Sequence, residues 1–286
     1  MPSLGAAAAA AAAAATAAST APLLTRLTPA AARTSVLALA RPPVNALNTA
    51  LLRELTSRVR QAERDAERGG GGGAALVLTS DSDSVFTSGL DLTEMIKPER
   101  DVREFWGALQ ELFLALYGTP LVTVCALAGT SPAGGCLLAM ACDYRVAASD
   151  APKARIGLNE AKFGLLAPPW FARPLADCVG VRRADKMLQL GELLGFADAH
   201  RVGLVDELVP KADVLARATQ VAEEWVANGP AEARHASKLV LRAALIDWLT
   251  ANRAADADLF VGRVLSHGTQ RAVSEYLASL GRRGPR

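Results

Sequence analysis

The sequence predicts an α/β protein with a helical C-terminal region, because three patterns recur along its 286 residues. Short, continuously apolar runs predict buried parallel strands. Between them lie longer segments whose apolar residues repeat every three or four positions, as in amphipathic helices. After Pro210 almost every segment has this helical spacing. Strands that alternate with helices predict a parallel sheet covered by helices.

Each expected element follows from one of these patterns. Apolar runs predict strands at 23–28, 34–40, 74–79, 121–127 and 143–148, with a strand-to-loop transition at 154–160. Helical spacing predicts helices at 47–67, 99–117, 133–141, 168–178, 182–190 and 197–202, a short helix near Asp91, and about four helical segments from 211 to 280. A Pro-Ala-Ala-Ala turn joins the first two strands, and the glycine run at 69–73 predicts a loose connector.

Three parts of the chain are expected: an alanine-rich extension at 1–21, an α/β core at 22–210 and a helical region at 211–286. The extension is either a disordered low-complexity segment or a mitochondrial transit segment. It is acid-poor, since the first acidic residue is Glu54, but it is not Arg-rich, since the first basic residue is Arg26.

Composition excludes several classes of function. The formal net charge is +2, which gives no reason to expect nucleic acid as a partner. No run of bulky apolar residues is long enough for an integral membrane segment. The four cysteines have no CxxC pairing and are expected to be buried thiols. No spacing of His, Cys and Asp predicts a metal site.

The turn at 130–136 is the first candidate site. Gly134 and Gly135 stand between an apolar strand and a helix of small residues, where backbone N–H groups can approach a ligand closely. The positive end of the helix dipole lies at the same place, so the turn can hold a developing oxyanion. No GxSxG motif is present and the three histidines follow the core motifs, so nucleophilic serine chemistry is not expected.

Four segments, in order, resemble the crotonase (enoyl-CoA hydratase/isomerase) superfamily over residues 23–280, and most closely its mitochondrial Δ3,Δ2-enoyl-CoA isomerases. They are Arg-Pro-Pro-Val-Asn-Ala-Leu at 41–47, Phe-Thr-Ser-Gly-Leu-Asp-Leu at 86–92, residues 129–136, and Asp-Tyr-Arg at 143–145. Residues 156–160, Ile-Gly-Leu-Asn-Glu, add to the match.

The resemblance implies a spiral of ββα repeats and a homotrimer joined through C-terminal helices. It also implies an acyl-CoA substrate. Coenzyme A is part of this substrate, and no further cofactor is expected. It implies a mitochondrial matrix enzyme of lipid metabolism, in the β-oxidation of unsaturated fatty acids. The amides of Leu90 and Gly134 would donate to the thioester oxygen. The loop residues Ser88, Gly89, Asp91 and Leu92 would contact the coenzyme A part of the substrate.

Removing a proton beside a thioester places negative charge on its oxygen, which two fixed amides stabilise. Hydratases of this superfamily use two glutamates to activate water. One matching position is Leu137, which cannot bind water, and the other is Glu160. A single carboxylate favours a proton shuttle from C2 to C4, with Asn159 orienting Glu160 or the substrate.

Apolar residues after Glu160 are expected to exclude water and raise its pKa; they are Phe163, Leu165, Leu166, Ala167 and Trp170. The alternatives are an enoyl-CoA hydratase of the same fold and a non-catalytic acyl-CoA-binding scaffold. Asp91 fits a helix N-terminal charge as well as a functional role, and Glu94 is expected at the surface. The basic residues Lys238, Arg242 and Arg253 are expected on a solvated helix face, or beside a coenzyme A phosphate.

Overall fold

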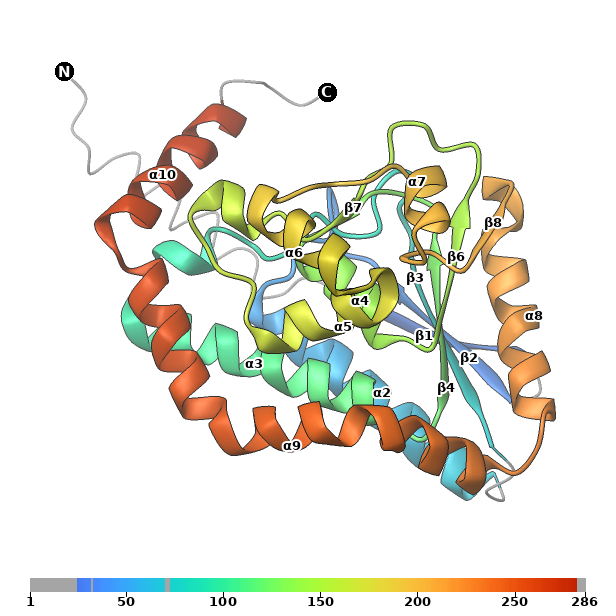
Figure 1. The fold of residues 1–286 in the computed structure, drawn as a ribbon. Coiled ribbons are helices and arrows are strands. Elements are labelled where there is room, and N and C mark those ends of the chain that lie inside the picture. The colour runs from blue at the N-terminus through green and yellow to red at the C-terminus, as the bar shows by residue number, and fades with distance from the viewer. Residues whose placement is uncertain (1–24, 32, 70–72, 282–286) are drawn as a thin grey trace.

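A six-stranded sheet forms the centre of this computed structural model, which describes residues 25–31, 33–69 and 73–281 (Figure 1). Its strands lie in the order β1 (Thr25–Ala31), β2 (Thr34–Leu39), β3 (Ala75–Ser80), β4 (Val122–Leu127), β6 (Tyr144–Ala148) and β8 (Glu207–Val209). The pair β1 and β2 is antiparallel, and all other neighbours are parallel. A second, parallel pair joins β5 (Ser131–Pro132) to β7 (Ile156–Gly157). The extension predicted over 1–21 lies outside the described residues.

Helices cover both faces of the sheet. On one face α8 (Val214–Ala227) packs on β3, β4 and β6. Across the sheet from it lie α2 (Thr49–Arg68), α3 (Glu99–Gly118) and α4 (Gly134–Ala141) (Figure 1). Because both faces are covered, β3 and β4 are buried along nearly their whole length and mostly apolar, as is typical of parallel strands.

The remaining helices form an outer layer. They are α5 (Pro169–Val179), α6 (Val181–Leu190), α7 (Phe196–Arg201), α9 (Ala231–Val264) and α10 (His267–Gly281), with the short 3₁₀ turns η2 (Glu94–Ile96), η3 (Glu160–Phe163) and η4 (Lys211–Asp213). The longest, α9, has 34 residues and packs along α3. The helix α10 lies beyond it and contacts both η2 and η3.

Most expected elements are confirmed within one to three residues. The described part of the region after residue 210 holds four helical segments, as expected: the 3₁₀ turn η4 and the helices α8, α9 and α10. Three features differ from the expectations. The strand β8 was not expected; its three residues carry too little pattern to be seen. Pro29 to Ala31 belong to β1 instead of a turn. Only the 3₁₀ turn η2 follows Asp91.

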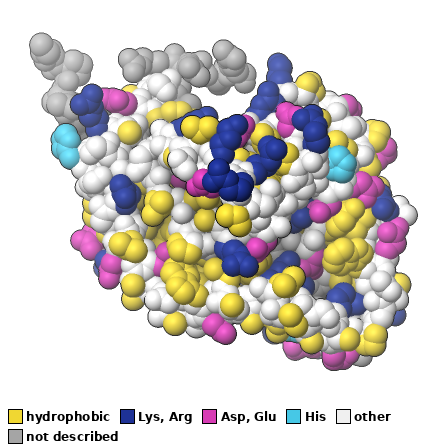
Figure 2. Space-filling view, in the orientation of Figure 1, with side chains coloured by type: hydrophobic (Ala, Val, Ile, Leu, Met, Phe, Trp, Pro, Cys, Tyr) yellow, Lys and Arg dark blue, Asp and Glu magenta, His cyan; other side chains and the backbone are white. Residues whose placement is uncertain are grey.

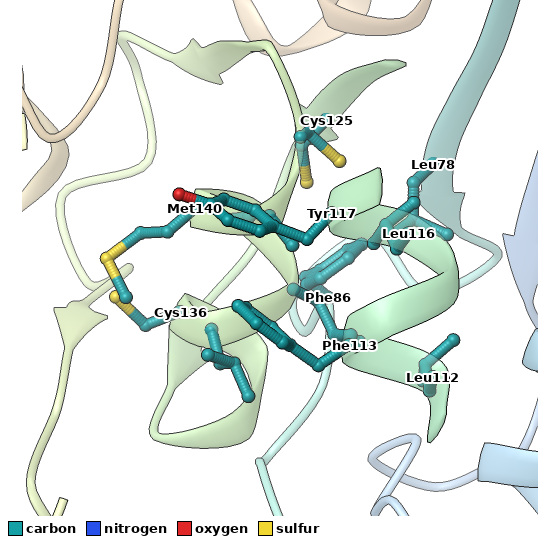
Figure 3. Close-up of a cluster of buried hydrophobic side chains, with 14 of the residues drawn as sticks. Leu78, Phe86, Leu112, Phe113, Leu116, Tyr117, Cys125, Cys136 and Met140 are labelled. Atoms are coloured by element: carbon teal, nitrogen blue, oxygen red, sulfur yellow. The ribbon is translucent and has the colours of Figure 1, made fainter. Parts of the chain in front are cut away.

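The centre of the core lies directly beneath the glycine turn. Figure 3 shows Phe86, from the loop after β3, packed beside Phe113 and Leu116 of α3, with Cys136 and Met140 of α4 nearby. All five side chains are buried. This cluster therefore fixes both the start of the 86–92 loop and the helix that follows the turn. The expected buried thiols are confirmed for Cys125, Cys136 and Cys142, and Cys178 is partly buried; all four are free.

Loops that follow the parallel strands meet at one edge of the sheet, because the carboxyl ends of parallel strands lie together. The loops after β2, β3 and β4 are joined there by two isolated parallel bridges, Leu47 to Leu90 and Val85 to Thr130. Three of the four segments with family resemblance therefore lie side by side. The domain boundary expected at 210 stays a prediction.

Candidate active site

The first candidate donor is the backbone N–H of Leu90. In its parallel bridge Leu47 donates to the Gly89 carbonyl at 2.8 Å and accepts from Asp91 N–H at 3.0 Å. A residue bridged in this way bonds its partner's two neighbours, so the N–H and carbonyl of Leu90 itself point away from Leu47. The Leu90 N–H is therefore available to a ligand.

Gly89 permits this arrangement by its backbone conformation. Its φ is +88°, a region that residues with a Cβ rarely adopt. A Cβ at this position would lie 3.0 Å from the carbonyl oxygen of Pro132 and 3.1 Å from the Cβ of Ala133. The 86–92 loop therefore presses against the glycine turn at the one residue that has no side chain.

The second candidate donor is the N–H of Gly134, the first residue of α4. The first N–H groups of a helix have no partner within it. Ala133 before it has a φ of +50° and donates its N–H to the Gly157 carbonyl at 2.8 Å. A Cβ on Gly134 would lie 3.2 Å from Cδ2 of Leu90, so the two donor residues are direct neighbours.

Glu160 supplies a buried carboxyl group. It begins η3, is 7% exposed, and neither carboxyl oxygen has a hydrogen-bond partner among the described residues. Burial raises its pKa from 4.5 to about 7, in the expected direction, because the charged form loses its hydration. The strand pair β5–β7 ties this residue to the turn, since Gly157 bonds Ala133 three residues before Glu160.

The surroundings of Glu160 differ from those expected. Leu166 is 64% exposed, and Trp170 turns away into an aromatic cluster where its indole N–H donates to Asp256 at 3.1 Å. The segment η3 instead contacts α6 and α10. Tyr276 of α10 packs edge-on against Phe163, with ring centroids 5.2 Å apart. The helix α10 also reaches η2, where Gln270 donates to the Met95 carbonyl at 2.8 Å.

Leu137 is fully buried in the first turns of α4 and can neither hold nor polarise water. Ser88 is exposed on the donor loop, while Leu92 is half-buried. Asp91 pairs with Arg41 at 3.1 Å and accepts the backbone N–H of Thr93, so it braces the loop. These positions of the loop residues are compatible with contacts to the coenzyme A part of a substrate. Those contacts, which the resemblance implies, stay predictions.

Asn159 is half-buried and makes no side-chain hydrogen bond to Glu160 within the described part of the chain. Its backbone carbonyl accepts from Lys162 at 3.1 Å. No direct contact therefore supports a role for Asn159 in orienting the Glu160 carboxyl. The other predicted role, orienting the substrate, stays a prediction.

Two expectations about charged residues are wrong. Glu94 is 5% exposed, accepts the Thr49 hydroxyl at 2.9 Å and pairs with Lys97 at 2.9 Å. Lys238 and Arg242 both pair with the buried carboxylate of Asp143, at 2.8 and 2.9 Å. These contacts join α9 to the residue before β6, so the two basic groups are not on a solvated face; a contact with a coenzyme A phosphate stays a prediction.

Arg253 is paired as well, with Glu111 of α3 at 2.8 Å. All three basic residues that were expected on a solvated face thus form ion pairs that join α9 to Asp143 or to α3. Within the described residues no group of three or more His, Cys, Asp or Glu side chains is arranged to hold a metal. No helix in the same part of the chain is both long enough and apolar enough to cross a bilayer.

Residues 31–280 match the enoyl-CoA hydratase/isomerase family. The chain belongs to this family, and its fold is the crotonase α/β fold, which confirms the resemblance and the fold class drawn from the sequence. It is therefore an enzyme of the enoyl-CoA hydratase/isomerase type.

The chain is also similar to individual proteins and to a solved structure. The chain is 40% identical to "Enoyl-CoA delta isomerase 1, mitochondrial" of Mus musculus over 247 residues, 86% of this chain and 83% of the relative. The crystal structure of human mitochondrial delta3-delta2-enoyl-CoA isomerase matches with a TM-score of 0.87 at 37% identity, over 92% of this chain and 100% of that one. "Probable enoyl-CoA hydratase echA8" of Mycobacterium tuberculosis is 32% identical over 218 residues, 74% of this chain and 79% of the relative.

Proposed function

We propose that this enzyme is a Δ3,Δ2-enoyl-CoA isomerase that converts 3-enoyl-CoA, cis or trans, into trans-2-enoyl-CoA. The observation that carries the proposal is the solitary buried carboxyl of Glu160, together with Leu137 at the position where hydratases of this fold hold a second acid. The identity to proteins named as mitochondrial enoyl-CoA delta isomerases supports the same choice.

In the proposed reaction the ionised Glu160 removes a proton from C2 of the substrate. The electron pair of that C–H bond moves toward the thioester, and negative charge develops on the thioester oxygen. The N–H groups of Leu90 and Gly134 stabilise this enolate; removing one such donor typically costs about 10²–10³ in rate.

Protonated Glu160 then returns the proton to C4: the electron pair of the C3–C4 double bond forms the new C4–H bond, and the enolate pair forms the C2–C3 double bond. The thioester carbonyl is restored and Glu160 is ionised again. A pKa of about 7 suits this double role, because the group gives up and takes back a proton with little driving force either way near neutral pH. The low exposure of Glu160, 7%, limits the access of bulk water to its carboxyl group.

The ultraviolet absorbance of the conjugated 2-enoyl thioester tests the proposal with 3-hexenoyl-CoA as substrate. The full chain should isomerise it, and Glu160→Gln should abolish turnover while hexanoyl-CoA still binds in a calorimetric titration. Glu67→Gln, at an exposed site on α2, is the matched control and should keep full activity. Unchanged turnover in Glu160→Gln contradicts the proposal.

A hydratase of the same fold is the second candidate, supported by the 32% identity to a named hydratase. Water addition to crotonyl-CoA separates the two, and the isomerase proposal predicts that it is negligible beside isomerisation. A non-catalytic acyl-CoA-binding scaffold would bind hexanoyl-CoA and show neither activity. The buried, unpaired carboxyl of Glu160 argues against a scaffold, because burying such a group costs stability.

A homotrimer is part of the proposal. On α9, Leu241, Trp248 and Leu259 are exposed by 84%, 38% and 74% and stand two and three helical turns apart, on one face of the helix. Figure 2 shows hydrophobic side chains at the surface in the lower part of the view, where α9 runs. A second copy of the chain is the proposed occupant of this face. Light scattering behind size-exclusion chromatography should give three times the 29.8 kDa of one chain, and a monomer contradicts it.

We also propose the mitochondrial matrix as the location, in the β-oxidation of unsaturated fatty acids. The support is that the relatives at 40% identity carry "mitochondrial" in their names. The full chain, fused at its C-terminus to a fluorescent protein, should accumulate in mitochondria, and removal of residues 1–21 should prevent this. A fusion that stays outside mitochondria contradicts the location without affecting the proposed chemistry.

A further inference from the structure

Asn45 organises the loop that carries the Leu90 donor. It is 3% exposed and has a φ of +49°, a left-handed conformation that Asn tolerates better than most residues. Its side-chain Oδ1 accepts the Arg41 N–H at 2.7 Å. Its Nδ2 donates to the Ser80 hydroxyl at 2.8 Å and to the Phe86 carbonyl at 3.0 Å. The amide side chain thus joins the loop after β2 to the end of β3 and the first residue of the donor loop.

Thr87 continues this connection toward the donor. Its hydroxyl donates to the Asn45 carbonyl at 2.6 Å and accepts the Gly89 N–H at 3.1 Å. The Gly89 carbonyl is bonded as well, because it accepts the Leu47 N–H. With both sides of Gly89 held, the peptide plane that carries the next N–H, that of Leu90, has a fixed orientation.

Thr87 also touches the element that carries the second donor. A Cβ on Gly135 would lie 2.7 Å from the Thr87 methyl carbon, so this methyl group rests against the first turn of α4. The side chain of Thr87 is fully buried and has no route to a substrate. Its contacts therefore reach Asn45, the Gly89 peptide and the Gly134–Gly135 turn.

We propose that Thr87 is a positioning residue for the oxyanion site: its hydroxyl aims the Leu90 N–H at the oxygen where the enolate charge develops. The proposal rests on the isomerase function proposed above, because it assumes that an enolate forms. It goes beyond that function in assigning a buried threonine, away from the reacting atoms, a share of the rate. A displacement of a few tenths of an ångström in a donor weakens a charge-assisted hydrogen bond, and this loss appears in the transition state more than in the bound substrate.

The test compares the full-length wild type with Thr87→Val, which removes the hydroxyl and keeps the shape. Thr87→Ser and Thr87→Ala form a second pair, in which both lack the methyl and only serine retains the hydroxyl. Thr56→Val is the matched control, since its hydroxyl is also buried and donates to a backbone carbonyl, that of Leu52 at 2.9 Å. Steady-state rates with 3-hexenoyl-CoA and thermal melting are measured for each variant.

A spectroscopic measurement isolates the oxyanion site. Acetoacetyl-CoA is an enolisable thioester whose enolate absorbs in the near ultraviolet, so the pH at which the bound ligand ionises reports directly on enolate stabilisation. A loss of fold stability alone does not move this pH. Hexanoyl-CoA, which does not form an enolate under these conditions, reports binding of the ground state.

The expected result for Thr87→Val is a kcat about tenfold or more below that of the wild type, with KM and hexanoyl-CoA affinity within about threefold. The bound acetoacetyl-CoA should ionise about one pH unit higher, which is the same tenfold factor. Thr87→Ser should keep most of the wild-type kcat and enolate ionisation, and Thr87→Ala should lose both. Thr56→Val should match the wild type in kcat and in enolate ionisation.

The positioning role is overturned if the wild type is active and Thr87→Val has the same kcat and the same pH of enolate ionisation. If Thr87→Val does not fold, the positioning role is overturned by equal kcat and equal enolate ionisation in Thr87→Ser and Thr87→Ala. A wild type that neither isomerises 3-hexenoyl-CoA nor ionises bound acetoacetyl-CoA overturns the proposed function instead, so the two failures are distinct.

Discussion

Replacing Glu160 by glutamine should make the protein more stable at pH 8 while it removes the proposed activity. The carboxyl group is buried, and within the part of the chain that the structure describes neither of its oxygens has a hydrogen-bond partner. At pH 8 the group is mostly ionised, and the folded state therefore holds an uncompensated charge away from water. Glutamine has nearly the same shape and no charge.

The size of the effect follows from the pKa of Glu160. The folded state raises it from 4.5 to about 7, which is about 2.5 units, and at 1.36 kcal/mol per unit this amounts to about 3 kcal/mol. The folded state binds this proton more tightly than the unfolded state does. The stability that Glu160 contributes is therefore present below pH 4.5, is lost as the pH rises toward 7, and stays lost above it.

Urea unfolding of the wild type and Glu160→Gln at pH 5 and pH 8 measures this difference. The variant should gain about 3 kcal/mol over the wild type at pH 8 and just under about 1 kcal/mol at pH 5. Glu67→Gln, on the exposed surface, should change the free energy of unfolding by less than about 0.5 kcal/mol at either pH. A Glu160→Gln protein that is no more stable than the wild type at pH 8 refutes the reasoning.

Three further outcomes are expected. The value of kcat/KM for 3-hexenoyl-CoA should fall about tenfold per pH unit below pH 7 and level off above it, since the ionised Glu160 is the base; a flat profile from pH 5 to 8 contradicts this. Gly135→Ala should lower kcat at least about tenfold in steady-state kinetics, because its Cβ would lie 2.7 Å from the Thr87 methyl; wild-type kcat contradicts this. Asp256→Ala should cost about 3–5 kcal/mol in urea unfolding, because the N–H groups of Trp106, Trp170 and Gln110 lose their acceptor, whereas the exposed control Asp258→Ala should cost under about 1 kcal/mol.

The glycine positions of the proposed donor site were predictable from the sequence, whereas the proposed donor role of Leu90 came from the family resemblance. Gly89 and Gly134 sit where a buried strand passes into a loop or helix, and a Cβ at either position would meet neighbouring atoms at 3.0–3.2 Å. A glycine at such a place is a signal that a single sequence displays. The hydrogen bond from the Thr87 hydroxyl to the Asn45 carbonyl has no such signal, since it joins residues 42 positions apart. It depends on how the loops after β2 and β3 come together.

The surroundings of Glu160 were only partly predictable, because neighbours in sequence are not neighbours in space around a short 3₁₀ turn. The apolar residues that follow Glu160 were expected to cover it, yet Leu166 faces solvent and Trp170 packs around Asp256. The segment η3 instead contacts α10, more than a hundred positions further along the chain, where Tyr276 packs against Phe163. In the same way, Lys238 and Arg242 carry a surface composition but meet Asp143 in the interior.

The sequence by itself determined the fold class, the order of nearly all the elements and the glycine turns. These properties are local, since apolar periodicity and the absence of a side chain act within a few residues. Only the tertiary structure decided that the Glu160 carboxyl is buried with no hydrogen-bond partner among the described residues, and that Thr87 contacts both the Gly89 peptide and the first turn of α4. Both depend on contacts between distant segments, whose desolvation and hydrogen bonding exist only once the chain has folded.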